Sequence, residues 1–333
     1  MKYCVYGGQY GSEGKGSLTE WLATNGAFRD GFDAVGEAAP NSGHSCSLGK
    51  TRNLPACSYW ADRVLLGPDS VINCDLLLED LANIHNAVGD HPEVIIHEAA
   101  AISTKADIEA EKQSSLESRI SSTCSGSWYP RYRKYILREP DAIMMNSAPN
   151  SIKANSRIRI VGSHQWLVTA YSLNHAIFEC SQGLLLDTCF GLYPHVTSRS
   201  TLPSAALARN GLSHLNWKMV GVYRIYPIRT GGPSGPTGGM ELTWDSLGLP
   251  PEITTVTKRT RRVFTWSTLD FDLSIKLGRP DILALTHLDY LPRSMTFAQW
   301  LVEHKILEIA GFPRLLVSSA VGDFDEIHLN EDR

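Results

Sequence analysis

The feature that most constrains the fold of this chain is a glycine-rich loop near the N-terminus, GGQYGSEGKG at residues 7–16. The apolar residues 2–6 before it predict a short buried strand, and residues 17–23 after it predict the first turns of a helix. In such a unit the glycines let backbone N–H groups turn toward a ligand, and the helix adds the positive end of its dipole. A phosphate group is the natural ligand, and Lys15 would neutralise one of its oxygens.

The loop lacks the spacing of an ordinary nucleotide-binding P-loop. Gln9 stands where the first glycine of that motif should be, and Gly16 replaces the serine or threonine that follows the lysine. The alternative interpretation is a tight turn whose lysine faces solvent, because glycine turns after strands are common. The rest of the chain favours the phosphate-binding interpretation.

Strand and helix patterns alternate along the rest of the chain, which predicts a mainly parallel α/β architecture. The predicted elements are a helix at 76–88, strands at 93–98, 157–161, 219–228 and 282–286, an amphipathic helix at 296–309 and a last strand at 315–317. Two further segments, GGPSGPTGG at 231–239 and TTVTKRTRR at 254–262, are predicted loops too short to link independent domains. We therefore expect a single domain over residues 1–333, with one sheet threaded through it from end to end.

The charge and cysteine content exclude several classes of protein. With 31 Lys and Arg against 35 Asp and Glu, the net charge of -4 leaves no basic field to hold a nucleic-acid backbone. The cysteines are odd in number and never form a CxxC pair, which argues against a disulfide framework or a zinc site and fits a reducing cytoplasm. No segment predicts an export signal or a membrane span. We expect a cytoplasmic protein that binds small anionic ligands, with no nucleic-acid or membrane partner.

Three longer motifs resemble those of adenylosuccinate synthetases. The loop at 7–16 closely resembles their G-x-Q-W/Y-G-D-E-G-K-G pattern, with serine at position 12 in place of aspartate. PNSGHS at 40–45 resembles their N-A-G-H-T signature, and SQGLLLD at 181–187 with GLYPHVTS at 191–198 resembles A-Q-G-x-x-L-D followed by G-T-Y-P-x-V-T-S. Weaker matches follow the family's order at 122–123 with Arg138, at 221–237, at 257–262 and at 286–289, where THLD resembles T-K-L-D. The resemblance implies an α/β fold with a predominantly parallel sheet flanked by helices, adenylosuccinate-synthetase-like and related to the P-loop proteins.

The resemblance also implies a ligase that joins aspartate to the six-position of a purine nucleotide at the expense of a nucleoside triphosphate. In this family a base removes the purine N1 proton, the six-oxygen attacks the γ-phosphate, and the aspartate amine displaces phosphate, with Mg²⁺ bridging the phosphates. By resemblance the catalytic residues are Ser12, Lys15 and His44, and His44 stabilises charge that develops on the oxygen. Taken alone, a histidine in a loop is more often structural or solvated.

The binding residues follow from the same resemblance. Those expected at the donor nucleotide are Ser12, Gly14, Lys15, Gly16, Ser17, Gly43, Ser45, Asp289 and Gly322. Those expected at the substrate nucleotide are Ser12, Asn41, Thr123, Arg138, Gln182 and Thr197, with Arg138 supplied by the partner subunit of a homodimer. Those expected to bind aspartate are Thr257, Arg259, Arg261 and Arg262, and the expected Mg²⁺ ligands are Ser12 and Gly43. Guanidinium groups can grip a carboxylate through two hydrogen bonds, although such a charge run alone also fits a solvated loop.

Position 12 separates this chain from ordinary members of the family, in which an aspartate serves as the N1 base and as a magnesium ligand. An unactivated serine is a poor base. Its hydroxyl leaves room for the 2-amino group of guanine and can accept a hydrogen bond from it, whereas hypoxanthine has only a C–H there. This resembles the phage-type branch of the family, which acts on dGMP to make the succinyl precursor of 2-aminoadenine deoxynucleotide, with ATP or dATP as the expected donor.

Several alternatives stay open from the sequence. They are an ordinary synthetase acting on IMP with GTP, a catalytically inactive nucleotide sensor marked by Ser12, and a P-loop nucleotide kinase or unrelated synthetase, against which the failed P-loop spacing counts. The donor base is also open. Asp289 keeps the carboxylate that accepts hydrogen bonds from guanine in this family, but His287 replaces the lysine that packs over the base.

Overall fold

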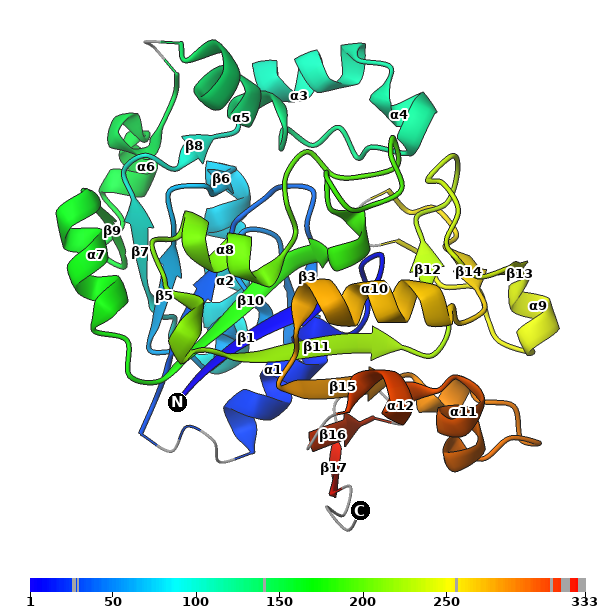
Figure 1. Ribbon diagram of the computed structural model, residues 1–333. Coiled ribbons are helices and arrows are strands. Elements are labelled where there is room, and N and C mark those ends of the chain that lie inside the picture. The colour runs from blue at the N-terminus through cyan, green and yellow to red at the C-terminus, as the bar shows by residue number, and fades with distance from the viewer. Residues whose placement is uncertain are drawn as a thin grey trace.

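The computed structural model describes residues 1–25, 28, 30–139, 142–254, 257–311, 314–318 and 324–328. Within this part of the chain, ten strands form one sheet in the order β17-β16-β15-β11-β1-β10-β2-β5-β7-β9 (Figure 1). Neighbouring strands are parallel except at one edge, where β17 runs antiparallel to β16. In sheet order the strands are Asp325–His328, Arg314–Val317, Ile282–Thr286, Lys218–Arg224, Lys2–Gly7, Ala176–Gly183, Asp33–Gly36, Arg63–Leu66, Glu93–His97 and Ile158–Val161. The predicted α/β fold with a mainly parallel sheet is confirmed.

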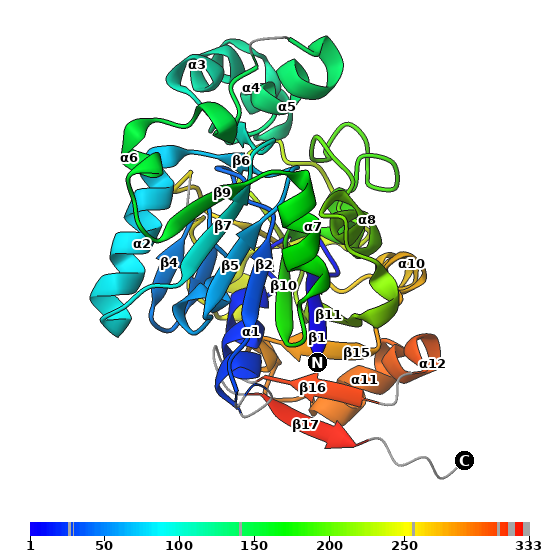
Figure 2. The same cartoon turned by 90° about the vertical axis from the view of Figure 1, so that its left-hand side faces the viewer.

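The sheet is buried on both faces, as parallel sheets usually are. On β1, Tyr3 and Val5 enter one hydrophobic core while Cys4 and Tyr6 enter another, because successive side chains of a strand point to opposite faces. The helices that cover the first face are α1 (Lys15–Thr24) and α2 (Cys74–Val88), and those on the second are α7 (Ser163–Tyr171), α8 (Pro203–Arg209) and α10 (Thr268–Gly278) (Figure 2).

The N-terminal strand lies in the middle of the sheet. β10, from the second half of the chain, pairs with β1 on one side and with β2 on the other, while β11 pairs with the opposite side of β1. The prediction of one sheet threaded from end to end holds for the ten-stranded sheet, but three small sheets lie beside it in the described part of the chain, and the sequence patterns did not single out β2, β5 or β10. The strand order was therefore not predicted, although the insertion of β10 beside β1 is what assembles the site described below.

Three predicted elements differ in the structure. The segment 219–228 ends as β11 at Arg224 and resumes as β12 (Ile228–Arg229), in a separate sheet with β13 (Glu241–Leu242) and β14 (Arg262–Phe264). The segment 296–309 forms two helices, α11 (Phe297–Glu303) and α12 (Ile306–Ala310), because Lys305 between them has a left-handed conformation with φ 54°. The predicted loop 254–262 ends one residue early, because Arg262 begins β14.

The remaining elements include a group of short helices that lies at one end of the molecule in both views (Figures 1 and 2). They are α3 (Lys105–Gln113), α4 (Leu116–Ile120), α5 (Tyr129–Arg131), a π-helical turn at Tyr132–Leu137 and α6 (Asn150–Lys153). Elsewhere lie α9 (Trp244–Leu247) and the strand pairs β3 (His44–Cys46) with β4 (Gly49–Thr51) and β6 (Val71–Ile72) with β8 (Ala101–Ile102). No helix within the described ranges is long and apolar enough to cross a membrane.

We expect Gly183→Ala to destabilise the protein strongly, because β10 ends against the glycine-rich loop. A Cβ at position 183 would meet the backbone nitrogen of Gly11 at 2.3 Å and the carbonyl oxygen of Gln9 at 2.4 Å. That oxygen also accepts the Leu185 N–H, so it cannot move freely. The free energy of unfolding, measured with urea, should fall by about 3 kcal/mol or more. The control Gly89→Ala has open space around its Cβ, and its positive φ alone should cost about 1 kcal/mol. Equal losses in the two variants would contradict this explanation.

Candidate active site

The carboxyl ends of four neighbouring parallel strands, β10, β1, β11 and β15, surround a cavity of about 610 Å³. Three of these strands hydrogen-bond the loop at 7–16 through their last or second-last residue, and the loop itself follows the fourth strand, β1. The three bonds run from Lys15 Nζ to the Gln182 carbonyl (2.9 Å), from Arg224 Nη1 to the Ser12 carbonyl (3.2 Å) and from Thr286 Oγ1 to the Glu13 carbonyl (2.7 Å). The loop is thus held at the edge where parallel sheets bind ligands.

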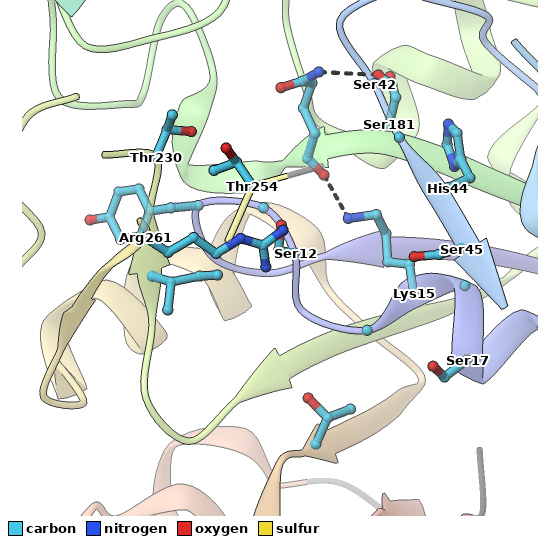
Figure 3. Close-up of a pocket in the computed structure, with 18 of the residues that line it drawn as sticks. Ser12, Lys15, Ser17, Ser42, His44, Ser45, Ser181, Thr230, Thr254 and Arg261 are labelled. Carbon is cyan, nitrogen blue, oxygen red and sulfur yellow. Dashed lines mark hydrogen bonds between the residues drawn. The ribbon is translucent and has the colours of Figure 1, made fainter. Parts of the chain in front are cut away.

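Lys15 is the cation of this loop. Its ammonium group donates to Glu13 Oε2 (3.0 Å). It also donates to the Gln182 carbonyl, the bond that ends at Lys15 in Figure 3. Glu13 is fully buried beneath the loop, and its other oxygen accepts the N–H groups of Gln9 (3.2 Å) and Gly11 (2.7 Å). Lys15 is therefore fixed at the cavity instead of pointing into solvent, which rules out the alternative interpretation of a simple turn.

The start of α1 provides further positive potential at the cavity. Gly16 and Ser17 line the cavity, and the first N–H groups of a helix have no partner within it. A Cβ on Gly16 would lie 2.0 Å from the carbonyl oxygen of Ser45 on β3. This contact explains why glycine follows the lysine here, where a P-loop has serine or threonine.

His44 is held in one orientation by a buried carboxylate. The sequence placed His44 in a loop, whereas the structure places it on the short strand β3, with Nδ1 2.7 Å from Oε1 of Glu179. Since an ionised carboxylate can only accept a hydrogen bond, Nδ1 carries the proton and Nε2 is left for the cavity that His44 lines. Burial raises the pKa of Glu179, but His44 and the Ala56 N–H outweigh it and hold that pKa below its usual value.

Three residues expected at the substrate nucleotide come together from distant segments. Asn41, Thr123 and Gln182 all line the cavity. Gln182 has a left-handed conformation with φ 67°, which aims its carbonyl at Lys15, and its amide donates to Ser42 Oγ (3.2 Å; Figure 3). The order of these segments in the chain did not require this convergence, and the contact of these residues with a substrate nucleotide stays a prediction.

The three arginines expected to bind aspartate have different surroundings. Arg261 lines the same cavity as Ser12, and both side chains are labelled in Figure 3. Arg259 and Arg262 are not part of the cavity wall, and their guanidinium groups pair with Glu117 and Glu241 respectively. The structure therefore brings one of the three arginines to the site.

Another part of the cavity wall is formed by the segment that follows β15. His287 has a left-handed conformation with φ 60° and lines the cavity together with Asp289 and Tyr290. Burial, followed by the nearby Arg224 guanidinium, lowers the pKa of His287 to about 3, so this side chain is neutral at physiological pH. Its ring centroid lies 5.2 Å from that of Tyr290.

The cavity gathers most of the residues predicted from the sequence. Those that line it are Ser12, Gly14, Lys15, Gly16, Ser17, Asn41, Gly43, His44, Ser45, Thr123, Gln182, Thr257, Arg261 and Asp289. Besides Arg259 and Arg262, two others do not line it. Thr197 lies next to the wall, since its N–H donates to the carbonyl of Leu186 (2.8 Å), and Arg138 is exposed at the end of the π-helical turn. Gly322 lies outside the described residues.

The sequence patterns missed Glu179, Arg229 and Glu252. For Glu179 a signal existed, because an acidic residue inside the apolar run AIFEC at 176–180 must find a partner when that run is buried. Arg229 lines the cavity with its guanidinium 4.8 Å from the ring centroid of Tyr10, and no local pattern distinguishes it from a surface arginine. Glu252 does not line the cavity but accepts a hydrogen bond from Arg261, and no local pattern in the sequence marks it.

Known proteins resemble this chain over most of its length. The sequence model of one family, adenylosuccinate synthetase, matches residues 143–298. The protein of Vibrio phage phiVC8 named N6-succino-2-amino-2'-deoxyadenylate synthase is 32% identical over 299 residues, which are 85% of this chain and 84% of that protein. The protein of the same name from Cyanophage S-2L is 30% identical over 302 residues, 85% of this chain and 81% of that one. The solved structure of Cyanophage S-2L succinoaminodeoxyadenylate synthetase, bound to dGMP and to dATP as an energy donor, has a TM-score of 0.81 at 26% identity and covers 98% of this chain and 95% of its own.

The chain therefore belongs to the adenylosuccinate synthetase family, whose members are C–N bond-forming ligases. Within that family, the relatives reported above are phage enzymes named as synthases of the succinylated 2-aminoadenine deoxynucleotide. The family and the fold predicted from the loop and the later motifs are both confirmed.

We expect His287 to contribute to acid sensitivity. Its pKa is about 3 in the folded protein and 6.5 in a solvated chain, so protonation favours the unfolded state and stability falls as the pH drops from 6.5 toward 3. His287→Asn keeps a residue that tolerates the left-handed conformation but removes the titration. Between pH 7 and pH 4.5, the free energy of unfolding of the variant should fall by about 2 kcal/mol less than that of the wild type. The same substitution at the exposed His164 should leave the wild-type loss unchanged. Equal losses in the wild type and His287→Asn would contradict the assignment.

Proposed function

We propose that this chain condenses L-aspartate with dGMP, using ATP or dATP through a 6-phosphoryl intermediate, to give 2-amino-2'-deoxy-N6-succinyladenylate for 2-aminoadenine nucleotide synthesis. The observation that carries the proposal is Ser12, which lines the cavity where the family has aspartate, in a loop that otherwise keeps the family pattern. The names of the phage relatives, and the dGMP and dATP in the cyanophage structure, support the same substrates. An enzyme of this phage type would act in the cytoplasm of the host.

In the first step, the six-oxygen of guanine attacks the γ-phosphorus, the bond from that phosphorus to the β,γ-bridging oxygen breaks, and the nucleoside diphosphate leaves. The phosphates would lie at the start of α1, where Lys15 and the N–H groups of Gly16 and Ser17 attract negative charge. His44 would donate from Nε2 to the oxygen on which charge develops, and Glu179 would stabilise the imidazolium that this requires. The N1 proton passes beside Ser12 to water or a phosphate oxygen, because a serine hydroxyl alone is a weak base.

In the second step, the aspartate amine attacks the six-position carbon and phosphate leaves. Arg261 and Thr257 at the cavity wall would hold aspartate. Arg261 gives one N–H group to Glu252, and within the described part of the chain the other N–H groups of its guanidinium have no hydrogen-bond partner, so they would be available for a carboxylate. Arg259 and Arg262, which pair with glutamates away from the cavity, have no part in this proposal.

The substrate nucleotide would lie between the loop and the residues from β10. The Ser12 hydroxyl would accept a hydrogen bond from the 2-amino group, which IMP does not have. Asn41, Thr123 and Gln182 would contact its base and phosphate, and Thr197 would approach them from beside Leu186. A buried polar group that is left unpaired by the wrong base is a stronger source of selectivity than a missing apolar contact.

The residues at the cavity fit Mg²⁺ when the phosphates supply most of its ligands. Mg²⁺ prefers oxygen ligands and usually combines few protein groups with phosphate oxygens and water. Among the described residues, no three His, Cys, Asp or Glu side chains converge on a metal-sized site. The protein would contribute the Ser12 hydroxyl and the Gly43 carbonyl, both of which belong to cavity-lining residues. When bound, the ion neutralises part of the charge on the transferred phosphoryl group.

The donor base would occupy the part of the cavity lined by His287, Asp289 and Tyr290. A neutral His287 supplies a flat ring without charge, which suits adenine as well as guanine. We choose ATP or dATP as donor because dATP is the energy donor in the cyanophage structure. Gly322, predicted to contact the same nucleotide, stays a prediction.

The first test offers dGMP and IMP in parallel to the protein with Mg²⁺, aspartate and ATP, and detects the succinylated nucleotide by mass spectrometry. We expect product from dGMP and a far smaller rate from IMP. Ser12→Asp should move the ratio of kcat/KM values toward IMP by about tenfold or more, because a carboxylate restores a base and crowds the 2-amino group. Aspartate tolerates the left-handed φ of 58° at this position. Product from IMP alone would keep the family and refute dGMP as substrate, and nucleotide binding without any product would favour a sensor.

The second test concerns the homodimer. Arg138 is exposed and follows a π-helical turn whose apolar side chains Ile136 and Leu137 are 67% and 46% exposed, which suits a surface covered by a second subunit. If Arg138 reaches the partner's cavity, Lys15→Gln and Arg138→Gln should each be nearly inactive. Mixed in equal amounts, they should regain about a quarter of wild-type activity, because half of the dimers then contain one complete site. A mixture no more active than its components would argue against a shared site.

A further inference from the structure

Glu252 lies behind the cavity wall and binds three side chains. Its oxygens accept hydrogen bonds from Arg224, from Arg261 Nη1 (3.0 Å) and from the Tyr290 hydroxyl (3.0 Å). The Arg224 side chain is 1% exposed and the Arg261 side chain 17%, so a single carboxylate pairs with two largely buried guanidinium groups. Burial raises the pKa of Glu252, but Arg224 and Arg261 outweigh it and hold the pKa at about 2, so Glu252 is ionised at any working pH.

Each partner of Glu252 belongs to a different part of the site. Arg224, at the end of β11, also donates to the Ser12 carbonyl. Arg261 lines the cavity where aspartate is proposed to bind, and Tyr290 lines it at the proposed donor base. Glu252 thus joins the glycine-rich loop to both ends of the cavity.

The two arginines do not depend on Glu252 equally. Arg224 has a second side-chain anchor at Ser12, and its backbone N–H donates to the Gln9 side chain (3.0 Å). Within the described ranges, Glu252 is the only hydrogen-bond partner of the Arg261 guanidinium. Without the Glu252 carboxylate that they share, the guanidinium groups of Arg224 and Arg261 would repel each other. Arg261 would move, because it has fewer other hydrogen bonds to hold it. Loss of the Glu252 charge would therefore displace Arg261 from the cavity wall.

We propose that Glu252 is a positioning residue for the second chemical step, which holds the Arg261 guanidinium where a carboxylate of aspartate binds. The proposal rests on the proposed function, from which it takes the aspartate site. We expect it to separate the two steps, because the side chains that would act on the phosphoryl group, Lys15 and His44, are held by Glu13 and Glu179 and not by Glu252. Removing its charge impairs the capture of aspartate far more than phosphoryl transfer.

Glu252→Gln tests this proposal, because glutamine keeps the size and one acceptor oxygen but loses the charge. Phosphoryl transfer is measured without aspartate, as the movement of labelled oxygen from the β,γ-bridge of ATP to the other β-phosphate positions in the presence of dGMP. Ligation is measured as product formed against aspartate concentration. In the variant, isotope exchange should stay within about threefold of wild type, while the KM for aspartate should rise by about tenfold or more, as expected for a lost charge-assisted hydrogen bond.

Two further variants test whether the effect on the KM for aspartate is specific to the Glu252 charge. Glu241→Gln removes the carboxylate that pairs with Arg262 away from the cavity, and it should leave the KM for aspartate unchanged. Tyr290→Phe removes one hydrogen bond to Glu252 but neither ion pair, and should raise that KM only about two- to threefold.

Failure of the Glu252 proposal can be told apart from failure of the proposed function. An unchanged KM for aspartate in Glu252→Gln would overturn the proposal, and so would an equal loss of exchange and ligation, which would make Glu252 a general structural residue. Absence of both exchange and product in the wild type would instead overturn the proposed function, and this inference with it.

Discussion

The conformation of the glycine-rich loop depends on the carboxylate of Glu13 buried beneath it. A buried carboxylate is unfavourable unless it is fully paired, and Glu13 is paired with two loop N–H groups and with Lys15. The loop and its lysine therefore cannot rearrange independently. Because Lys15 also donates to the Gln182 carbonyl, the same interaction ties the end of β1 to the end of β10. The position of the Lys15 ammonium group is thus set by two strands that are far apart in sequence.

Strand β10 contributes more to the site than any pattern in its sequence indicated. Glu179 orients His44 through Nδ1, and Gln182, three residues later, fixes Lys15 through its backbone carbonyl. Gly183 then lets the strand end in contact with the loop. Lys15 and His44 both depend on this one strand, which can reach them because β10 lies between β1 and β2 in the sheet.

The fold class was predictable because local sequence patterns indicate it. These patterns are an apolar strand, a glycine-rich loop and a helix, followed by further alternating strands and helices. The strand order was not, because pairing of β1 with β10 is a contact between residues more than 170 positions apart, and no local pattern records it. Residues from the loop at 12–17 and from the motifs at 40–45 and 181–183 line one cavity, and the sequence could point to them because each motif is long and specific. For the three arginines at 259–262, the sequence could not tell which one lines the cavity. Whether such a residue faces the cavity or a surface glutamate depends on the start of β14 and on partners such as Glu241, which lie outside the motif.

A common arrangement recurs at three places around the cavity. At each place a glutamate accepts a hydrogen bond from a basic side chain: Glu13 from Lys15, Glu179 from His44 and Glu252 from Arg261. In each pair a buried or mostly buried carboxylate fixes the direction of a group that can carry positive charge, so its remaining N–H groups face the space where anionic ligands would bind. Such fixed donors need little reorganisation during a reaction, which makes them effective in a site that excludes water. Serine at position 12 fits this arrangement, because an aspartate there would add negative charge on the cavity side, close to where the phosphates are proposed to lie. Under the proposed function the chain would lose a base by this substitution, but it would keep the three oriented hydrogen-bond donors and would lower the repulsion between the protein and its ligands.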